Sequence, residues 1–460
     1  MRAGASLDKG FGVFRMGYGM FVLGLSFAMG MLFVTPLAYA DEVVLYSSAT
    51  DKPPPAMVAK GETVNLQKCV EIALERQPNI LAARNAQSAL QGRVGQAKAG
   101  YYPKVDLSAG YNKTQPVPSP LIRTAPGIYD QYTASASLTQ TLYDFGKTSA
   151  LVGIQRYGLD AAESDLENTR LSIIYGVKVA YYGYLQAGRN VAVGEETVLQ
   201  LKKHMEQAQA FFAAGTRPKY DVTKAEVDLS NAKLALMHAV NYVRLAKLNL
   251  DNAMGIPGAT DFSLVDDMDY RKYNINLEDS VARAYTSRPD IRSMMAKKHG
   301  AEESLDLAKR GYYPTLSGYA QYNWAGTALP LSDGWNVGVS LTLPLFSGFS
   351  TSYQVQESRA NYDLSVSNEE QLRQNVFYEV HQAYLNMKEA EERISSSELV
   401  VRQVQEVMDM AIGRYGAGVG TPIEVTDAQI ALSNAKTTYI QSLSDYKLAQ
   451  AALEKAIGGR

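Results

Sequence analysis

Hydrophobic and polar residues follow two different periods along this chain, and the change from one period to the other occurs twice. Residues 64–99 and 275–308 carry apolar residues at helical spacing, and each stretch contains one proline, Pro78 or Pro289. Because proline disrupts the interior of a helix, each stretch is predicted to form either two short helices or one kinked helix.

After each of these stretches the hydrophobic period changes to two. Apolar residues alternate with small polar residues over Trp335–Leu345 and over Tyr132–Leu142, and more weakly over 105–111 and 316–324. The pattern predicts four strands, two in each half of the chain. An apolar face opposite a small-polar face over about ten residues is typical of a transmembrane β-barrel. A soluble β-sandwich also alternates, but it needs more strands than these.

Two long helical stretches follow the strands. Residues 147–214 and 350–417 each span 68 residues without a proline. At about 1.5 Å per residue each helix would be on the order of 100 Å long. Each stretch runs into Ala-Gly, turns, and resumes as a shorter helix over 221–254 or 424–457. Glycine at a helix end suits the positive φ needed there, so two helical hairpins are predicted.

The two halves are copies of one repeat. Residues 212–255 and 415–458 align without a gap at an offset of 203, with 15 of 44 positions identical. The loop around 113–131 is eight residues longer than its partner around 325–334, as expected of loops at an exposed end. The predicted organisation is a first repeat over 64–255 (helix, β-hairpin 101–145, helical hairpin 147–254), a connector over 256–274, and a second repeat over 275–458 (helix, β-hairpin 312–346, helical hairpin 350–457).

The first forty residues have the features of an export signal. A positive region is followed by the apolar run Met16–Val34, and Ala38-Tyr39-Ala40 forms a small-residue cleavage site. The alternative is a retained transmembrane anchor, since about 19 residues is near the minimum span. We predict a signal peptide over 1–40 and a flexible leader over 41–63.

Composition argues against several classes of protein. The net charge of −2 gives no basic surface for nucleic acid, and the single cysteine, Cys69, cannot form an intrachain disulfide. The four histidines lack metal-ligand spacing and are predicted to be structural. Gly146-Lys147-Thr148 is like the end of a phosphate-binding loop, but Thr141 stands where that loop needs glycine. We expect no enzyme, no cofactor and no metal.

Four strands per chain cannot close a barrel, and lipid does not tolerate open sheet edges, so the chain is predicted to oligomerise. Two copies would give eight strands around an interior filled by side chains, and three copies would give twelve strands around an aqueous lumen. The small polar residues of the inner face suit a wet pore. The pattern therefore predicts a duct rather than a ligand pocket.

The chain resembles the TolC family of outer-membrane efflux and secretion channels, nearly from end to end of the predicted mature part. The resemblance is carried by the duplicated helix–strand–strand–helix order and by the Gly-Tyr-Tyr-Pro sequences that begin at Gly100 and Gly311. Leu341–Phe346 and the two hairpin turns add to it. It implies a mixed α and β membrane protein, with four transmembrane strands per chain in a trimeric twelve-stranded barrel and a long periplasmic α-helical barrel.

The resemblance also implies function and partners. The protein would lie in the bacterial outer membrane and serve as the exit duct of a tripartite efflux pump or a type I secretion system. Its partners would be two further copies of itself, a periplasmic adaptor protein, an inner-membrane transporter and outer-membrane lipid. The alternative is a non-conducting trimeric coiled-coil stalk or adhesin anchored in the membrane.

Candidate gate residues follow from the same resemblance. Family members carry a ring of acids after the second turn, which matches Glu424 and Asp427, although both could instead be acids favoured at a helix start. The family closes its entrance with a tyrosine and an aspartate, matched by Tyr415 and Asp221, and with an arginine whose position holds Gly420 here. We hypothesise that Arg217 of the first turn supplies the closing ion pair, to Glu424 or to an acid of a neighbouring subunit. Otherwise Arg217 is a solvated residue facing the adaptor.

Adaptor docking is expected at the exposed glycine-rich turns of the two hairpins. The residues concerned are Gly215, Thr216 and Pro218 in the first turn and Gly418, Val419 and Gly420 in the second.

Overall fold

The computed structural model describes residues 61–115, 127–258 and 261–459, all within one unit, Ala56–Arg460. The predicted export signal, most of the predicted leader and the centre of the 113–131 loop lie outside the described residues. Within the described residues, no helix combines the length and the apolar character that crossing a membrane requires.

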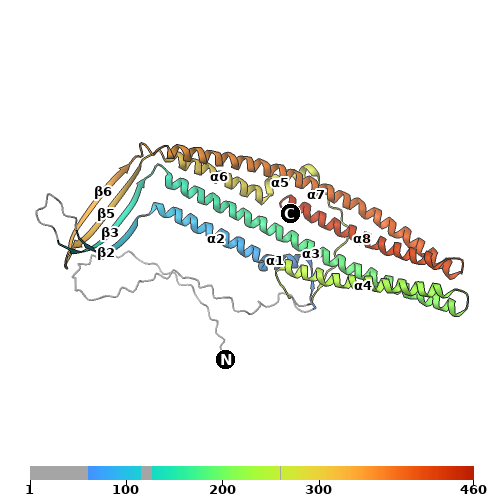
Figure 1. The fold of residues 1–460 in the computed structure, drawn as a ribbon. Helices are drawn as coiled ribbons and strands as arrows, with labels where there is room; N and C mark the ends of the chain where they lie inside the picture. Colours follow the sequence, from blue (N-terminus) through green and yellow to red (C-terminus); the bar gives the residue numbers. More distant parts are fainter. Residues whose placement is uncertain (1–60, 116–126, 259–260, 460) are drawn as a thin grey trace, which may run out of the picture. The chain divides into compact units, whose positions relative to one another are not determined.

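Apart from one 3-10 turn in the first half, the described elements occur in the same order in the two halves of the chain (Figure 1). The first half contains β1 (Thr63–Val64), α1 (Leu66–Arg76), α2 (Pro78–Lys98), a 3-10 turn (Ala99–Tyr101), β2 (Lys104–Thr114), β3 (Tyr129–Tyr143), α3 (Lys147–Ala213) and α4 (Lys219–Met254). The second half contains β4 (Ser263–Leu264), α5 (Leu277–Ser287), α6 (Pro289–Arg310), β5 (Thr315–Gly326), β6 (Ser332–Thr342), α7 (Ser350–Gly416) and α8 (Pro422–Ala456).

The two stretches that contain a proline each form two helices rather than one kinked helix. Pro78 begins α2 and Pro289 begins α6, because proline at the first helical position has no amide that needs a partner. The long helices α3 and α7 have 67 residues each. The last strand is shorter than its alternation predicts, since β6 ends at Thr342, two residues before Pro344, which cannot donate to a strand ladder.

The four long strands form one antiparallel sheet in the order β2-β3-β5-β6. Its register pairs Leu107 with Ala136, Ala136 with Tyr322, and Tyr322 with Trp335, so apolar residues of every strand share one face. The opposite face carries small polar residues such as Ser108 and Ser135, whose hydroxyl oxygens lie 2.8 Å apart. Within the described chain, β2 and β6 have no neighbour on their outer edges.

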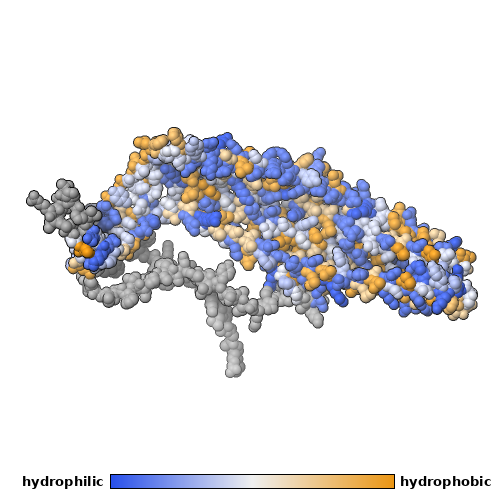
Figure 2. All heavy atoms as spheres, in the orientation of Figure 1, coloured by the Kyte–Doolittle hydropathy of each residue, from blue (hydrophilic) through white to orange (hydrophobic). Residues whose placement is uncertain are grey.

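The apolar face of the sheet is open to its surroundings. Leu107 is 79% exposed, Trp335 75% and Val337 70%. Figure 2 shows hydrophobic side chains gathered on the surface where β6 leads into α7, the position of the exposed Leu345 and Phe346. Exposing an apolar surface of this kind to water is unfavourable, and contact with lipid would cover it.

Each passage from strand to long helix is a sharp turn. Phe145 (φ 55°) and Phe349 (φ 65°) adopt left-handed backbone conformations, which cost energy in residues other than glycine and persist only where neighbours hold them. The Lys147 ammonium donates to the Tyr313 carbonyl at 2.8 Å and to the Thr315 hydroxyl at 3.1 Å. The Gly-Lys-Thr sequence therefore joins the first half to the second, as a structural turn rather than a nucleotide loop.

The main hydrophobic core lies around the middle of the long helices, where α1, α5 and the segment before α5 pack against α3, α7 and α8. That segment crosses the helices and is held by polar contacts. The Tyr181 hydroxyl donates to the Val265 carbonyl at 2.6 Å, and Arg189 contacts both carboxylate oxygens of Asp266 at 2.8 and 2.9 Å. The sheet and the turns of the helical hairpins lie at opposite ends of this core (Figure 1).

Both repeats anchor the end of the returning helix at the residue before the proline. The Gln77 amide donates to the carbonyls of Asn252 and Ala253 at 2.7 Å. In the second repeat the Arg288 guanidinium, which is 11% exposed, donates to the Ala456 carbonyl at 3.0 Å.

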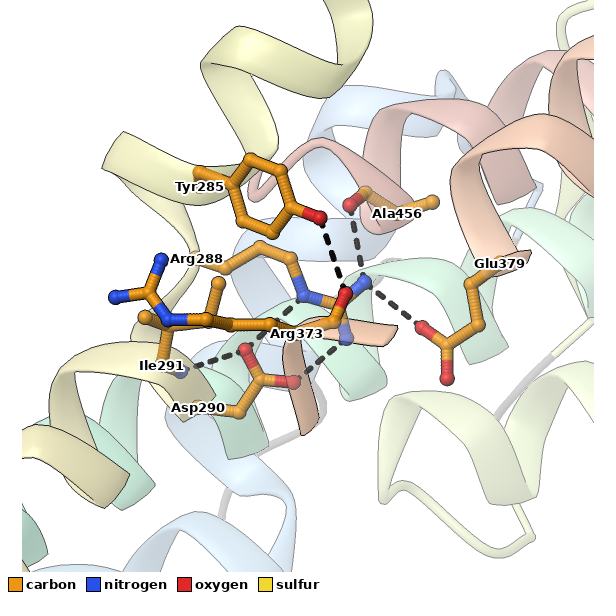
Figure 3. Close-up of polar contacts among 7 residues, drawn as sticks. All are labelled: Tyr285, Arg288, Asp290, Ile291, Arg373, Glu379 and Ala456. Carbon is orange, nitrogen blue, oxygen red and sulfur yellow. Dashed lines mark hydrogen bonds and ion pairs between the residues drawn. The ribbon is translucent and has the colours of Figure 1, made fainter. Parts of the chain in front are cut away.

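Arg288 also pairs with two carboxylates, which the first repeat does not reproduce. It contacts Asp290 at 2.6 Å and Glu379 of α7 at 2.8 Å (Figure 3). A charged donor with two acidic partners makes stronger hydrogen bonds than a neutral amide. The end of α8, the returning helix of the second hairpin, is therefore held by stronger contacts than the end of α4, the returning helix of the first.

Replacing Arg288 by alanine should lower the free energy of unfolding by about 2–3 kcal/mol, since the Ala456 carbonyl and the Asp290 carboxylate both lose a half-buried partner. Arg288→Gln should cost roughly half as much, because glutamine makes this contact in the first repeat. Thermal unfolding followed by circular dichroism measures the difference. The control is Arg402→Ala, an exposed arginine of α7; equal effects of Arg288→Ala and Arg402→Ala would contradict the anchoring role.

Candidate functional site

The candidate site lies at the turns of the two helical hairpins. In the first turn Gly215 has φ 74° and the Thr216 amide donates to the Phe211 carbonyl at 3.0 Å. In the second, Gly418 has φ 78° and the Val419 amide donates to the Arg414 carbonyl at 3.1 Å. Glycine is needed at both positions because a left-handed residue lets the last helical carbonyls find partners. The prediction that the first helix of each hairpin ends at a glycine is confirmed.

Tyr415, near the end of α7, fills the space between the two hairpins and is fully buried. Its ring lies 4.9 Å from the His204 ring and 5.6 Å from the Phe211 ring, both of α3. Met408, Ala411, Val425 and Leu432 pack around it from α7 and α8. An aromatic ring enclosed on several sides buries a large apolar area, so Tyr415 is a main contact between the two hairpins.

The Tyr415 hydroxyl has no hydrogen-bond partner within residues 61–115, 127–258 and 261–459. Burial raises the pKa of this hydroxyl, the Asp221 carboxylate raises it further, and Arg217 lowers it. Asp221 is itself buried at the start of α4. The structure thus brings Tyr415 and Asp221 into electrostatic contact, without a hydrogen bond between them.

Arg217 extends from the first turn to the second. Its guanidinium donates to the carbonyls of Gly418 at 3.2 Å and Gly420 at 2.8 Å, and it lies 5.5 Å from the centre of the Tyr415 ring. Cationic donors to carbonyls and contacts over a tyrosine face are both stabilising. Arg217 is half-buried, so it is not a freely solvated residue; it holds the two turns together.

Within this chain Arg217 does not pair with Glu424, and its hypothesised pair with an acid of a neighbouring subunit stays a prediction. Glu424 pairs instead with Arg414 at 3.1 Å, and Glu424 also completes a capping box with Thr421 at the start of α8. The hydrogen bond from Arg414 keeps the pKa of Glu424 below its ordinary value. Arg217 and Glu424 already have nearer partners, because Arg217 points toward backbone carbonyls and Glu424 toward its own hairpin.

Gly420 is glycine for a steric reason. A Cβ atom at this position would lie 2.9 Å from the Tyr415 nitrogen and 3.0 Å from the Arg414 carbonyl carbon. The turn therefore has no room for the arginine that the family resemblance implies here. Gly420 is also buried, which argues against its predicted place in a docking surface, whereas Gly215, Thr216, Pro218, Gly418 and Val419 are all exposed.

Asp427 differs from Glu424 in its surroundings. It is exposed on α8 and has no hydrogen bond or ion pair in the described part of the chain. Glu424 and Asp427 lie three residues apart and so share a helix face. The charge of Asp427 is thus uncompensated within the chain, while that of Glu424 is offset by Arg414.

Several residues of the site were missed by the sequence analysis. Arg414 precedes Tyr415 directly, and this adjacency is the one signal that could have suggested it. The Thr426 hydroxyl of α8 donates to Asp228 of α4 at 3.0 Å, and Asp228 also pairs with Lys224. No sequence pattern indicates this contact, because it depends on how far one hairpin is shifted along the other.

No cluster of three or more metal-binding side chains occurs among the described residues. The two hairpin turns bring together a buried tyrosine, hydrogen bonds from Arg217 to the second turn, and the carboxylates Glu424 and Asp427.

Comparison with known proteins agrees with this geometry. The family model described as outer membrane efflux protein matches residues 69–256 and 280–459. The chain is 25% identical over 419 residues to the outer membrane protein TolC of Escherichia coli, covering 86% of this chain and 83% of the relative. It is 23% identical over 410 residues to the probable efflux pump outer membrane protein TtgC of Pseudomonas putida, with the same coverage.

Among solved structures, the outer membrane protein VceC of Vibrio cholerae superposes with a TM-score of 0.76 at 22% identity, over 86% of this chain and 96% of the other. The fold is that of this outer-membrane protein. The chain belongs to the outer membrane efflux protein family, a family of channel proteins rather than enzymes. The relatives give no support to a non-conducting stalk.

Proposed function

We propose that three copies of this chain form a gated duct through the outer membrane, which carries substrates from an inner-membrane transporter to the exterior. The observation that carries the proposal is the four-stranded sheet with an apolar face, a polar face and two open edges, continued by long helices. It would work in a tripartite efflux pump or in a type I secretion system.

The sheet itself argues for three copies. An open edge leaves backbone groups without partners, which lipid does not tolerate, so β2 of one copy must pair with β6 of the next. Three sheets give twelve strands, and a barrel of that size can hold water along its inner face, while eight strands leave room only for side chains. Serine, threonine and asparagine on the inner face suit the wet lumen.

The helices continue the duct on the periplasmic side. Apolar residues of α4 and α7 remain exposed in the single chain, among them Leu234, Met237, Tyr378 and Leu385. Helices of neighbouring copies would cover these residues and complete a helical barrel. The duplicated organisation into a first repeat (64–255), a connector (256–274) and a second repeat (275–458), preceded by an export signal over 1–40, fits a wall made of equivalent units.

The hairpin turns form the gate in this proposal. Tyr415 packs between the hairpins, Arg217 joins the two turns, and Asp221 lies buried beside them. Opening separates the second hairpin from the first, which breaks the hydrogen bonds of Arg217 and exposes Tyr415. The acids Glu424 and Asp427 would then face the entrance in three copies and favour cations.

The exposed ends of both turns are the proposed docking surface for a periplasmic adaptor. Gly215, Thr216 and Pro218 present the first turn, and Gly418 and Val419 present the second, with Val419 69% exposed. Small residues allow a partner's backbone to approach closely, and Val419 offers one apolar side chain that the partner can bury.

Arg217→Ala should raise the ratio of open to closed time by at least roughly tenfold, because the closed state loses hydrogen bonds from a charged donor that contribute about 1.5–3 kcal/mol. Single-channel recording of the purified protein in a planar bilayer measures this. Lys219→Ala, which removes an exposed cation two residues away, is the matched control and should change nothing. Equal open fractions for the wild type and Arg217→Ala would contradict the proposal that Arg217 holds the two turns together.

Asp427→Asn should reduce cation selectivity by roughly half, and Glu424→Gln should reduce it less, since Arg414 already offsets the charge of Glu424. Arg414→Gln should increase cation selectivity by freeing Glu424. Reversal potentials across a bilayer with a salt gradient rank the variants. Selectivity that is the same in all three variants and in the wild type would remove both acids from the conduction path.

A further inference from the structure

His204 is a buried imidazole at the contact between the two helical hairpins. It lies on α3, is 6% exposed, and its ring is 4.9 Å from the ring of Tyr415. Its Nε2 atom has no hydrogen-bond partner among the residues that the structure describes. A buried polar nitrogen without a partner is costly, and a buried charge at the same atom is more so.

The charged groups around His204 come mainly from α4. Asp228 and Asp221 favour the protonated imidazole, while Lys224 opposes it. Asp228 is already engaged by Lys224 and by the Thr426 hydroxyl of α8. From α7 the ring faces Tyr415, which lies beneath the Arg217 guanidinium, a second cation. Burial outweighs the two carboxylates, and the pKa of His204 lies below its ordinary value of 6.5.

We propose that His204 positions Tyr415 in the closed gate only while its imidazole is neutral, and that uptake of a proton at Nε2 separates the two hairpins. The inference rests on the proposed gate and deepens it, since it makes periplasmic acidity a signal for opening. His204 acts through Tyr415: the imidazolium needs water, water enters beside the Tyr415 ring, and the contact that also supports Arg217 is lost.

The direction of the pH effect follows from which state holds the proton more tightly. In the separated state His204 is solvated and titrates near 6.5, whereas in the closed state burial keeps it neutral to lower pH. Closure is therefore fully favoured above pH 6.5 and weakens as the pH falls through that value toward the lower pKa of the buried form. One proton of this kind changes the ratio of open to closed hairpins by up to about tenfold per subunit between pH 7.5 and 5.5.

The test is a distance measurement between the two turns. Spin labels are placed at the exposed positions Thr216→Cys and Val419→Cys, with one labelled subunit diluted among unlabelled ones. The native Cys69 is buried, and burial raises its thiol pKa to about 12, so it stays unlabelled. The pH range of 5.5–7.5 keeps ordinary carboxylates ionised, which isolates histidine.

Three further variants assign the effect to His204. His204→Phe keeps a ring beside Tyr415 but cannot take up a proton, so its turn-to-turn distance should be the same at pH 7.5 and 5.5. His204→Arg carries a permanent charge and should show the longer distance at both values. His238→Phe, at an exposed histidine of α4, is the matched control and should keep the response of the labelled parent.

The expected result is a longer population that grows, by up to about tenfold relative to the shorter one, on acidification of the parent. A distance that does not change with pH in the parent would overturn the proposal, and so would an undiminished change in His204→Phe. Should His204→Arg fail to fold, the phenylalanine variant still decides. Conductance of the same samples is scored separately: a protein that never conducts, even with Arg217→Ala, refutes the duct, whereas pH-independent turns in a conducting protein refute the role of His204.

Discussion

The hydrogen bonds that an open β-sheet edge cannot make within one chain are the constraint on which the rest of this structure depends. In the described part of the chain the sheet has four strands, and β2 and β6 have unpaired backbone groups on their outer edges, next to apolar side chains. Lipid offers such groups no partners. Under the proposed function, assembly with further copies is therefore part of folding, and the polar inner face would make the enclosed space a conduit. In that assembly the helices would take the symmetry that the strands impose, and each chain would contribute two similar hairpins to one wall.

The contacts near the hairpin turns differ from those in the core around the middle of the helices. The core around the middle of the helices is apolar and reinforced by Arg288 and by the segment that includes Asp266. Near the turns lie the buried hydroxyl of Tyr415 and the buried Nε2 atom of His204, both without hydrogen-bond partners in the described residues. Each unpaired group reduces the free energy that favours closure. Strong contacts in the core and unpaired polar groups near the turns fit the proposed gate, in which small changes in charge or contact would move the turns while the core stays intact.

Much of the fold could be predicted from the sequence because simple periods encode it. Alternation places the strands, the lack of proline permits the long helices, and glycine marks both turns. The end of β6 could not be predicted from alternation, which continues through Leu343 and Leu345 after the ladder has ended. The contacts between the two hairpin turns were predicted only in part. Aligning the two repeats makes Arg217 equivalent to Gly420, but Arg217 reaches the Gly420 carbonyl itself, a contact that depends on the relative position of two hairpins. The pairing of Arg414 with Glu424 was missed for a similar reason, because it forms across a turn.

The central claim is that one chain supplies a third of a closed barrel. The most direct measurement is the mass of the detergent-purified, full-length protein by native mass spectrometry, with gentle removal of detergent. The account predicts an assembly of three chains as the dominant species, resistant to dilution because the sheet edges are paired between copies. A stable monomer, or an assembly of two or four chains, would contradict it.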